Sequence, residues 1–394
     1  MSGEHAPLAP SSAPQWGHCS GHVMAAAQAP ELESESSRRG TAAHWVGSEV
    51  LGNFQSPQEG LPILCSDFIG KTAPNGVVID DEMAEGADIY TSDVLAVAQE
   101  HGAVQKMLVE HRVHAPQIHD KNWGTLDCAI PLIDEGVIYL WDYKNGHRET
   151  RAKGNLQLVN YMAGLYAELN INGLQDQHIR VVMRIVQPFC YKAKGAVDEW
   201  SFLLSDLRAY FNQLHAKAHE AFDKPTLSTG PWCRDCPAVK NCSAARRAAY
   251  NLIDYVNAPY QMDTMTGAEL AVERTILENG LVAAKARAQA IEDELHSRVS
   301  DGATDTGLSL EASRGRSAWT IPVEQAVALA GQFGADISKP GVKTPTQSVA
   351  AVPRELRQQF EQVLATVTHR PAGGLKLIEA GDTLGARVFK RKNQ

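Results

Sequence analysis

The chain has 394 residues, of which 44% are hydrophobic and 21% charged, a composition that suits a protein with one large core or two domains. It contains no run near the roughly 20 apolar residues of a membrane-spanning helix and opens on no apolar signal-like run. We therefore expect a cytoplasmic protein without a membrane partner. The net charge of −9 argues weakly against a nucleic-acid partner.

Local clusters of basic residues are more informative about partners than the net charge. Each cluster is equally compatible with a solvated surface. The clusters are Arg148, Arg151 and Lys153; Arg234, Lys240, Arg246 and Arg247; and Lys390, Arg391 and Lys392.

The first 35 residues are rich in Ala, Pro and Ser and are predicted to be loosely structured, apart from the motif Trp16-Gly-His-Cys19-Ser-Gly21. The main domain is predicted over residues 36–250. It opens with a helix that runs from about Gly40 to about Leu51. A second helix is expected over residues 83–105.

Three strands follow, and they define the fold class. Apolar runs predict strands over 108–116, 124–133 and 137–146, with a tight turn at Asp134-Glu135-Gly136 that makes the last two a hairpin. A helix over 155–169 and a strand over 178–188 come next. This order predicts an α/β fold with a mixed central sheet flanked by helices.

The rest of the chain is predicted to be mainly helical. Residues 202–222 form one helix and 262–300 a long one, and 308–394 form a small, mostly helical accessory module. Apolar residues of the long helix repeat at spacings of four and three, which predicts a helix-packing seam, either within the chain or in a dimer. The seam residues are Leu277, Leu281, Ala284, Ala288, Ile291 and Leu295.

Asp127, Asp142 and Lys144 are the candidates for catalytic chemistry. Asp142 and Lys144 are two residues apart, so both side chains point to the same face of a strand. Asp127 lies on the partner strand of the hairpin. Charges at the end of so apolar a strand are costly unless they are paired or bind a metal. An ordinary Asp–Lys surface pair is the alternative interpretation.

Four motifs in order resemble those of RecB-type nucleases of the PD-(D/E)XK superfamily: Gly40-Thr-Ala-Ala-His44, Gly124-Thr-Leu-Asp127, Trp141-Asp142-Tyr-Lys144 and Gln157-x3-Tyr161. The resemblance implies a PD-(D/E)XK restriction-endonuclease-like core. It implies that His44, Asp127, Asp142 and the carbonyl of Tyr143 hold Mg²⁺ or Mn²⁺. It further implies that Lys144 activates water and that Gln157 and Tyr161 contact substrate. The role of Glu110 stays open.

The seven cysteines are unevenly distributed, with three of them inside ten residues: Cys233, Cys236 and Cys242. In a chain without a secretory signal, such crowding indicates metal or cluster ligation. A fourth ligand is needed, and Cys19 is the best candidate. A zinc site completed by His18 or His22, or unliganded thiols, are the alternatives. The remaining cysteines are expected in the core: Cys65, Cys128 and Cys190.

One cysteine before the nuclease motifs and three after them resembles the iron–sulfur RecB-type nucleases, which hold a 4Fe–4S cluster. The whole arrangement is most similar to an uncharacterised phage and prophage nuclease family. It implies a DNA exonuclease or end-processing nuclease of phage-type replication or recombination in a bacterial host cell. A phage single-strand annealing or single-strand-binding protein is the expected protein partner. A non-catalytic DNA-binding or scaffold protein of the same fold, or DNA binding by residues 308–394, are the alternatives.

Overall fold

The computed structural model describes residues 6–29, 35–56, 62–190, 195–256, 265–314, 318–338, 344–369 and 372–379. The chain divides into two compact units, Met1–Arg287 and Ala288–Gln394, which are treated separately. None of the helices in the described ranges is long and apolar enough to cross a membrane.

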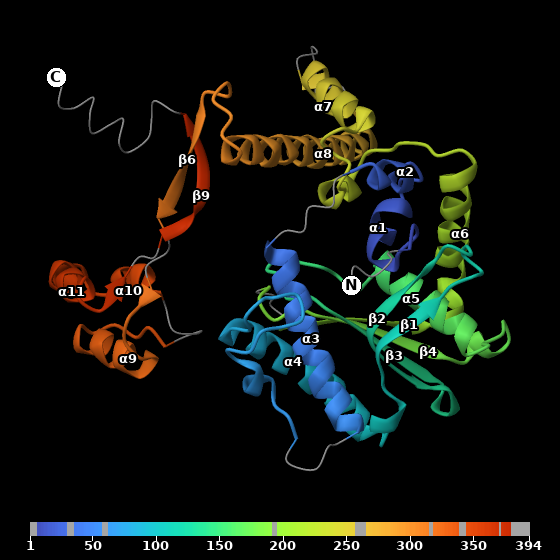
Figure 1. The fold of residues 1–394 in the computed structure, drawn as a ribbon, viewed down its shortest axis with the longest axis horizontal. Helices are drawn as coiled ribbons and strands as arrows, with labels where there is room; N and C mark the ends of the chain where they lie inside the picture. The colour runs from blue at the N-terminus through green and yellow to red at the C-terminus, as the bar shows by residue number, and fades with distance from the viewer. Residues whose placement is uncertain are drawn as a thin grey trace. The chain divides into compact units, whose positions relative to one another are not determined.

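A five-stranded sheet lies at the centre of the first unit, with strand order β1-β2-β3-β4-β5 (Figure 1). Neighbouring strands are antiparallel except β3 and β4, which are parallel. The sheet is therefore mixed, as the sequence predicts. Its strands are β1 (Leu108–His114), β2 (Trp123–Leu132), β3 (Val137–Tyr143), β4 (Arg180–Val186) and β5 (Val197–Leu203).

The edge strand β5 was not predicted, and the helix predicted over 202–222 begins only at Arg208. Side chains along β5 are half-buried or exposed, with none fully buried. A strand with one face open to solvent lacks the apolar run by which the buried strands were recognised.

Helices cover both faces of this sheet. Helices α3 and α4 pack on one face, and α5 and α6 pack on the other (Figure 1). Strands β3 and β4 are consequently buried on both sides, which explains their nearly continuous apolar sequences. The helices are α3 (Glu35–Gln55), α4 (Asp81–Glu100), α5 (Leu156–Glu168) and α6 (Arg208–Asp223).

The expectation of a loosely structured amino-terminal segment is wrong for residues 6–29. This segment forms α1 (Ala13–Trp16) and α2 (His22–Ala27), and Leu8 and Trp16 are fully buried in the core beside α5. Small residues permit this close packing. A Cβ atom on Gly17 would lie 2.7 Å from a carbonyl oxygen of α1 and 2.8 Å from a side-chain methyl of α5.

Hydrogen bonds join this segment to residues more than 200 positions later. The Ser20 hydroxyl donates to a Glu220 carboxylate oxygen over 2.7 Å. The Thr226 amide donates to the Ser20 hydroxyl over 2.9 Å, and the Gly21 amide donates to the Thr226 carbonyl over 2.9 Å. The segment is thus fixed against the end of α6 and the loop that follows.

Two further helices follow α6: α7 (Ser243–Val256) and α8 (Gly267–Ser300). The predicted seam of α8 is wrong in the first unit. Leu281 is 51% exposed, whereas Ala283 and Ala286 are buried. Alanines allow helices to approach closely, so the contact face of α8 consists of small residues rather than the predicted leucines.

The second unit is a mixture of helices and strands rather than the mostly helical module predicted. Its small core surrounds Ile337 and Phe360, both fully buried. The basic residues at 390–392 lie outside the described residues. Its elements are β6 (Leu308–Arg314), β7 (Ala318–Trp319), α9 (Val323–Gln332), α10 (Pro345–Ala351), α11 (Arg357–Leu364), β8 (Thr368–His369) and β9 (Ala372–Glu379).

Candidate metal centre

Asp142 and Lys144 lie at the end of the central strand β3. The Asp142 side chain is buried, with 1% of the residue exposed. The Lys144 ammonium donates a 3.1 Å hydrogen bond to Asp142 Oδ1 and lies 3.0 Å from Asp142 Oδ2. The two charged groups therefore form a pair at the rim of the buried sheet.

Helix α5 adds Gln157 and Tyr161 to this pair. The Asn155 side chain caps the helix by accepting from the Gln157 amide over 2.9 Å, which fixes the first turn. The Gln157 side-chain amide donates to Asp142 Oδ1 over 2.8 Å, and its carbonyl oxygen accepts from Lys144 over 3.2 Å. Tyr161 Oη lies 3.5 Å from the same Gln157 nitrogen. Gln157 thus holds both charged groups in place.

Asp127 and His44 meet on the α3 side of the sheet. His44 Nδ1 lies 3.4 Å from Asp127 Oδ1, and the Tyr143 amide donates to Asp127 Oδ2 over 2.6 Å. Glu110 of β1 joins them: ligand atoms of His44, Glu110 and Asp127 all lie within 4.8 Å of one another. Glu110, whose role the sequence left open, therefore belongs to the same cluster.

The backbone is irregular at this cluster. Glu110 has a φ of 45°, a left-handed conformation that is uncommon for a residue other than glycine. Along β2, Leu126 packs in the core beside α5, but Cys128 packs in the core beside α3 and α4. Residues two apart on a regular strand share a face, so the alternation is interrupted at Asp127. Strained backbone of this kind is typical of functional sites.

Proton affinities in the cluster are strongly perturbed. Burial lowers the pKa of His44, but the adjacent Asp127 carboxylate outweighs it and raises the pKa to about 9. Burial alone would raise the pKa of Asp127, yet His44 beside it brings that pKa below its usual value. Removal from water and repulsion by Asp127 raise the pKa of Glu110 to about 7, although part of its side chain reaches solvent.

Asp142 has an oxygen that suits a cation. Its Oδ2 atom is buried and has no hydrogen-bond partner among the described residues, because Lys144 donates to Oδ1. Burial raises the pKa of Asp142, and the Lys144 ammonium opposes this effect. A buried carboxylate oxygen without a donor is costly, and a divalent cation coordinated there would offset the cost.

The candidate ligands for such an ion are His44, Glu110, Asp127 and Asp142. Hard divalent cations bind carboxylate oxygens preferentially, and a metal would displace the proton that Asp127 now stabilises on His44. Tyr143, expected to offer its carbonyl, instead gives its amide to Asp127. Its ring stacks on Tyr90 at a centroid distance of 5.0 Å.

Comparison with known proteins places the chain in one family. Residues 5–384 match the family model described as "Protein of unknown function (DUF2800)". The chain belongs to the DUF2800 family. No solved structure matches it.

A second candidate site in this DUF2800 protein is formed by cysteines. Residues 19, 233, 236 and 242, the four predicted cysteine ligands, line one small cavity. Burial raises the pKa of Cys236 to about 11, and the other three thiols add to the effect. Backbone amides donate to three of the sulfurs: Ser228 to Cys19 (3.4 Å), Gly230 to Cys233 (3.5 Å) and Ala245 to Cys242 (3.5 Å).

The two histidines considered as alternative ligands differ in position. His22 Nδ1 lies 3.4 Å from Cys236 Sγ, and burial lowers the pKa of His22 to about 4. A neutral imidazole of this kind can bind a metal. His18 instead stacks on Trp232, with ring centroids 4.7 Å apart. His22 is therefore the better placed of the two.

The other cysteines lie apart from this cavity. Cys65, Cys128 and Cys190 are buried, which confirms the prediction that they are core residues. Burial raises the pKa of Cys65 to about 11, so its thiol is protonated and unreactive at neutral pH.

Proposed function

We propose that this DUF2800 protein is a divalent-metal-dependent nuclease that hydrolyses DNA phosphodiester bonds. The main support is the convergence of Asp127, Asp142 and Lys144 with a histidine and a further carboxylate at the end of the central strand. The element order α3-β1-β2-β3-α5-β4 is compatible with a PD-(D/E)XK core.

The acidic cluster would bind Mg²⁺ or Mn²⁺ through His44, Glu110, Asp127 and Asp142. The bound ion would supply Lewis acidity for water activation and positive charge for the transition state. In hydrolysis the water oxygen bonds to phosphorus, one P–O ester bond breaks, and the leaving oxygen takes a proton. Lys144, held against Asp142, orients the attacking water and neutralises developing negative charge.

Gln157 acts in this proposal as a positioning residue. It hydrogen-bonds both Asp142 and Lys144, so it keeps the lysine directed toward the site. Tyr161, beside it on α5, contacts the nucleic acid together with the exposed side of Gln157.

We also propose a 4Fe–4S cluster at the four cysteines. Amide donors to sulfur favour the thiolate form and tune iron–sulfur clusters. A single zinc ion with bonds of about 2.3 Å holds its sulfurs roughly 4 Å apart. Among the described residues, the group within 4.8 Å is the acidic one and not the thiols. This wider arrangement favours a cluster over one zinc ion.

The specific form of the proposal is an exonuclease or end-processing enzyme of phage-type replication or recombination. The alternative is a non-catalytic protein that binds DNA ends. Purified protein with Mn²⁺ should degrade end-labelled linear DNA, and the Asp142→Asn variant should not. Cutting of closed circular DNA would identify an endonuclease, and an intact linear substrate with retained DNA binding would favour the non-catalytic alternative.

A further inference from the structure

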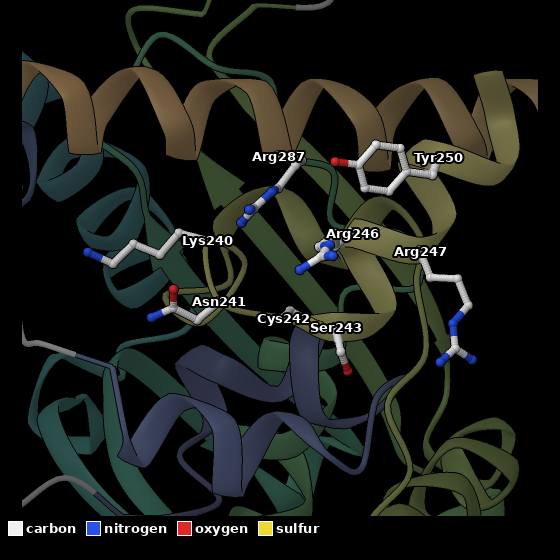
Figure 2. A pocket seen from close by; sticks show the side chains of 8 residues that line it. All are labelled: Lys240, Asn241, Cys242, Ser243, Arg246, Arg247, Tyr250 and Arg287. Atoms are coloured by element: carbon white, nitrogen blue, oxygen red, sulfur yellow. The ribbon is translucent and has the colours of Figure 1, made fainter. Parts of the chain in front are cut away.

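An open cavity of about 510 Å³ lies beside the cysteines and has a strongly basic lining (Figure 2). Four of its eight lining residues are cationic, none of the eight is acidic, and none belongs to the acidic cluster. Cys242 lines both this cavity and the cysteine cavity. The lining residues are Lys240, Asn241, Cys242, Ser243, Arg246, Arg247, Tyr250 and Arg287.

Two helices supply the arginines. Arg246 and Arg247 lie near the start of α7, whose first turn contains no acidic residue, so the positive end of the helix dipole adds to their charge. Arg287 comes from α8, and its guanidinium donates to the Val239 carbonyl over 3.4 Å. Buried Ala286 beside it brings α8 close to this loop. Like charges held together in this way favour an anion between them.

An aromatic ring lies at the edge of the same cavity. Tyr250 follows Arg246 by one helical turn, and the Arg246 guanidinium is 5.9 Å from the ring centroid. Tyr250 is 60% exposed, so its face is available to a ligand. Arginines that bind phosphates beside an exposed aromatic ring are typical of single-stranded nucleic-acid sites, because bases stack on the ring.

We propose that this cavity is a binding site for single-stranded nucleic acid, separate from the acidic cluster. Its arginines bind backbone phosphates, and Tyr250 stacks on a base. The choice of nucleic acid as ligand rests on the proposed nuclease function. Because no metal ligand takes part, binding here does not need a divalent cation.

The test is binding of a fluorescent oligothymidylate to the full chain in EDTA, followed by anisotropy over a range of salt concentrations. The double variant Arg246→Gln/Arg287→Gln should bind about ten-fold more weakly and lower the salt slope by about 1.4, at roughly 0.7 for each phosphate contact. The matched control is Arg274→Gln/Lys285→Gln, which removes the same charge from exposed positions of α8 outside the cavity. It should change affinity less than two-fold.

Two further variants separate a specific site from general effects. Tyr250→Ala should weaken binding about ten-fold and Tyr250→Phe should not, since stacking needs the ring and not the hydroxyl. Arg287→Lys keeps the charge and should bind better than Arg287→Gln if both variants melt at the wild-type temperature.

Equal losses in the control and cavity variants would overturn the proposal. So would displacement of the oligomer by inorganic phosphate together with no effect of Tyr250→Ala, which would indicate a small-anion site. Cleavage reports separately on the proposed function. A protein that never cuts DNA but binds through these arginines would refute the nuclease and retain the site, whereas cutting with arginine-independent binding would do the reverse.

Discussion

The backbone amide of Tyr143 donates a 2.6 Å hydrogen bond to the side-chain carboxylate of Asp127. Backbone pairing between β2 and β3 reaches Cys128 and Trp141, so one step beyond it the Asp127 side chain takes the place of a backbone partner. This bond fixes one oxygen of Asp127 and leaves the other beside His44. One aspartate therefore ends the sheet ladder and orients a candidate metal ligand.

Substitution of Asp142 or Lys144 should abolish cleavage without unfolding the protein. Asp142→Asn removes the carboxylate charge, and Lys144→Ala removes the ammonium group that neutralises developing charge. Each should slow cleavage by about 10²-fold or more, as expected for loss of one electrostatic catalytic group. The control is Asp134→Asn, at an exposed position in the turn of the same hairpin. Native cleavage rates in both site variants would disprove the assignment.

Metal affinity and turnover should respond to different residues. Asp127→Asn and Glu110→Gln should weaken Mn²⁺ binding, because each replaces a carboxylate in the cluster. Asp127→Asn can still accept from the Tyr143 amide, so the fold should persist. Gln157→Ala should leave Mn²⁺ affinity nearly unchanged and slow turnover, since Gln157 only positions its neighbours. Calorimetric titration measures the affinities, and equal losses in all three variants would refute this division.

The cysteine cavity should give a brown protein with about four iron atoms per chain if it holds a 4Fe–4S cluster. Cys19→Ala should lose the colour, lower the melting temperature and expose residues 6–29 to proteolysis. Cys65→Ala and Cys190→Ala should keep the colour, since both residues lie outside the cavity lining. A colourless, anaerobically prepared protein with one zinc ion would contradict the cluster.

Acid should selectively remove the contribution of Glu220 to stability. Hydrogen bonds from Lys217, Thr226 and Ser20 lower the pKa of Glu220 to about 2 from the usual 4.5. A lowered folded-state pKa stabilises the protein above about pH 4.5, and this stability is lost as the pH falls toward 2. Glu220→Gln should therefore lower the melting temperature at pH 7 and have little effect near pH 2. Glu85→Gln, at an exposed position of α4, should have little effect at either pH.

Two glycine-to-alanine substitutions in helices should have opposite effects. A Cβ atom on Gly86 of α4 would lie 2.6 Å from Tyr143 Oη and 2.8 Å from a ring atom of Phe189. Gly86→Ala should therefore destabilise the protein and disturb the metal cluster next to Tyr143. Gly52 of α3 has no atom within 4 Å of such a Cβ. Gly52→Ala should raise the free energy of unfolding by about 0.5–1 kcal/mol, measured by urea denaturation.

The sequence predicted those parts of the first unit in which burial leaves a continuous pattern. Strands β3 and β4 are apolar because both faces are covered, so their positions and the location of Asp142 and Lys144 at a strand end were predictable. The edge strand β5 has an exposed face and no such pattern. The segment containing Leu8 and Trp16 was missed because its Ala- and Pro-rich composition resembles that of loops.

The place of Glu110 could not be predicted from periodicity. Its left-handed φ and the interrupted alternation at Asp127 are departures from regular strand geometry, and a pattern rule assumes that geometry. The seam of α8 failed for a related reason. The rule favours leucines, whereas close approach of α8 to the rest of its unit depends on Ala283 and Ala286.

The contacts of Ser20 with Glu220 and Thr226 also affect the order of events during translation. Thr226 is made 206 residues after Ser20, and at about 5–20 residues per second this interval is on the order of 10–40 s. Until then Leu8 and Trp16 leave the ribosome before their partners in α5 and α6 exist. A nascent chain stopped shortly before residue 208 should therefore keep these side chains accessible to chaperones, and completion of α6 should bury them.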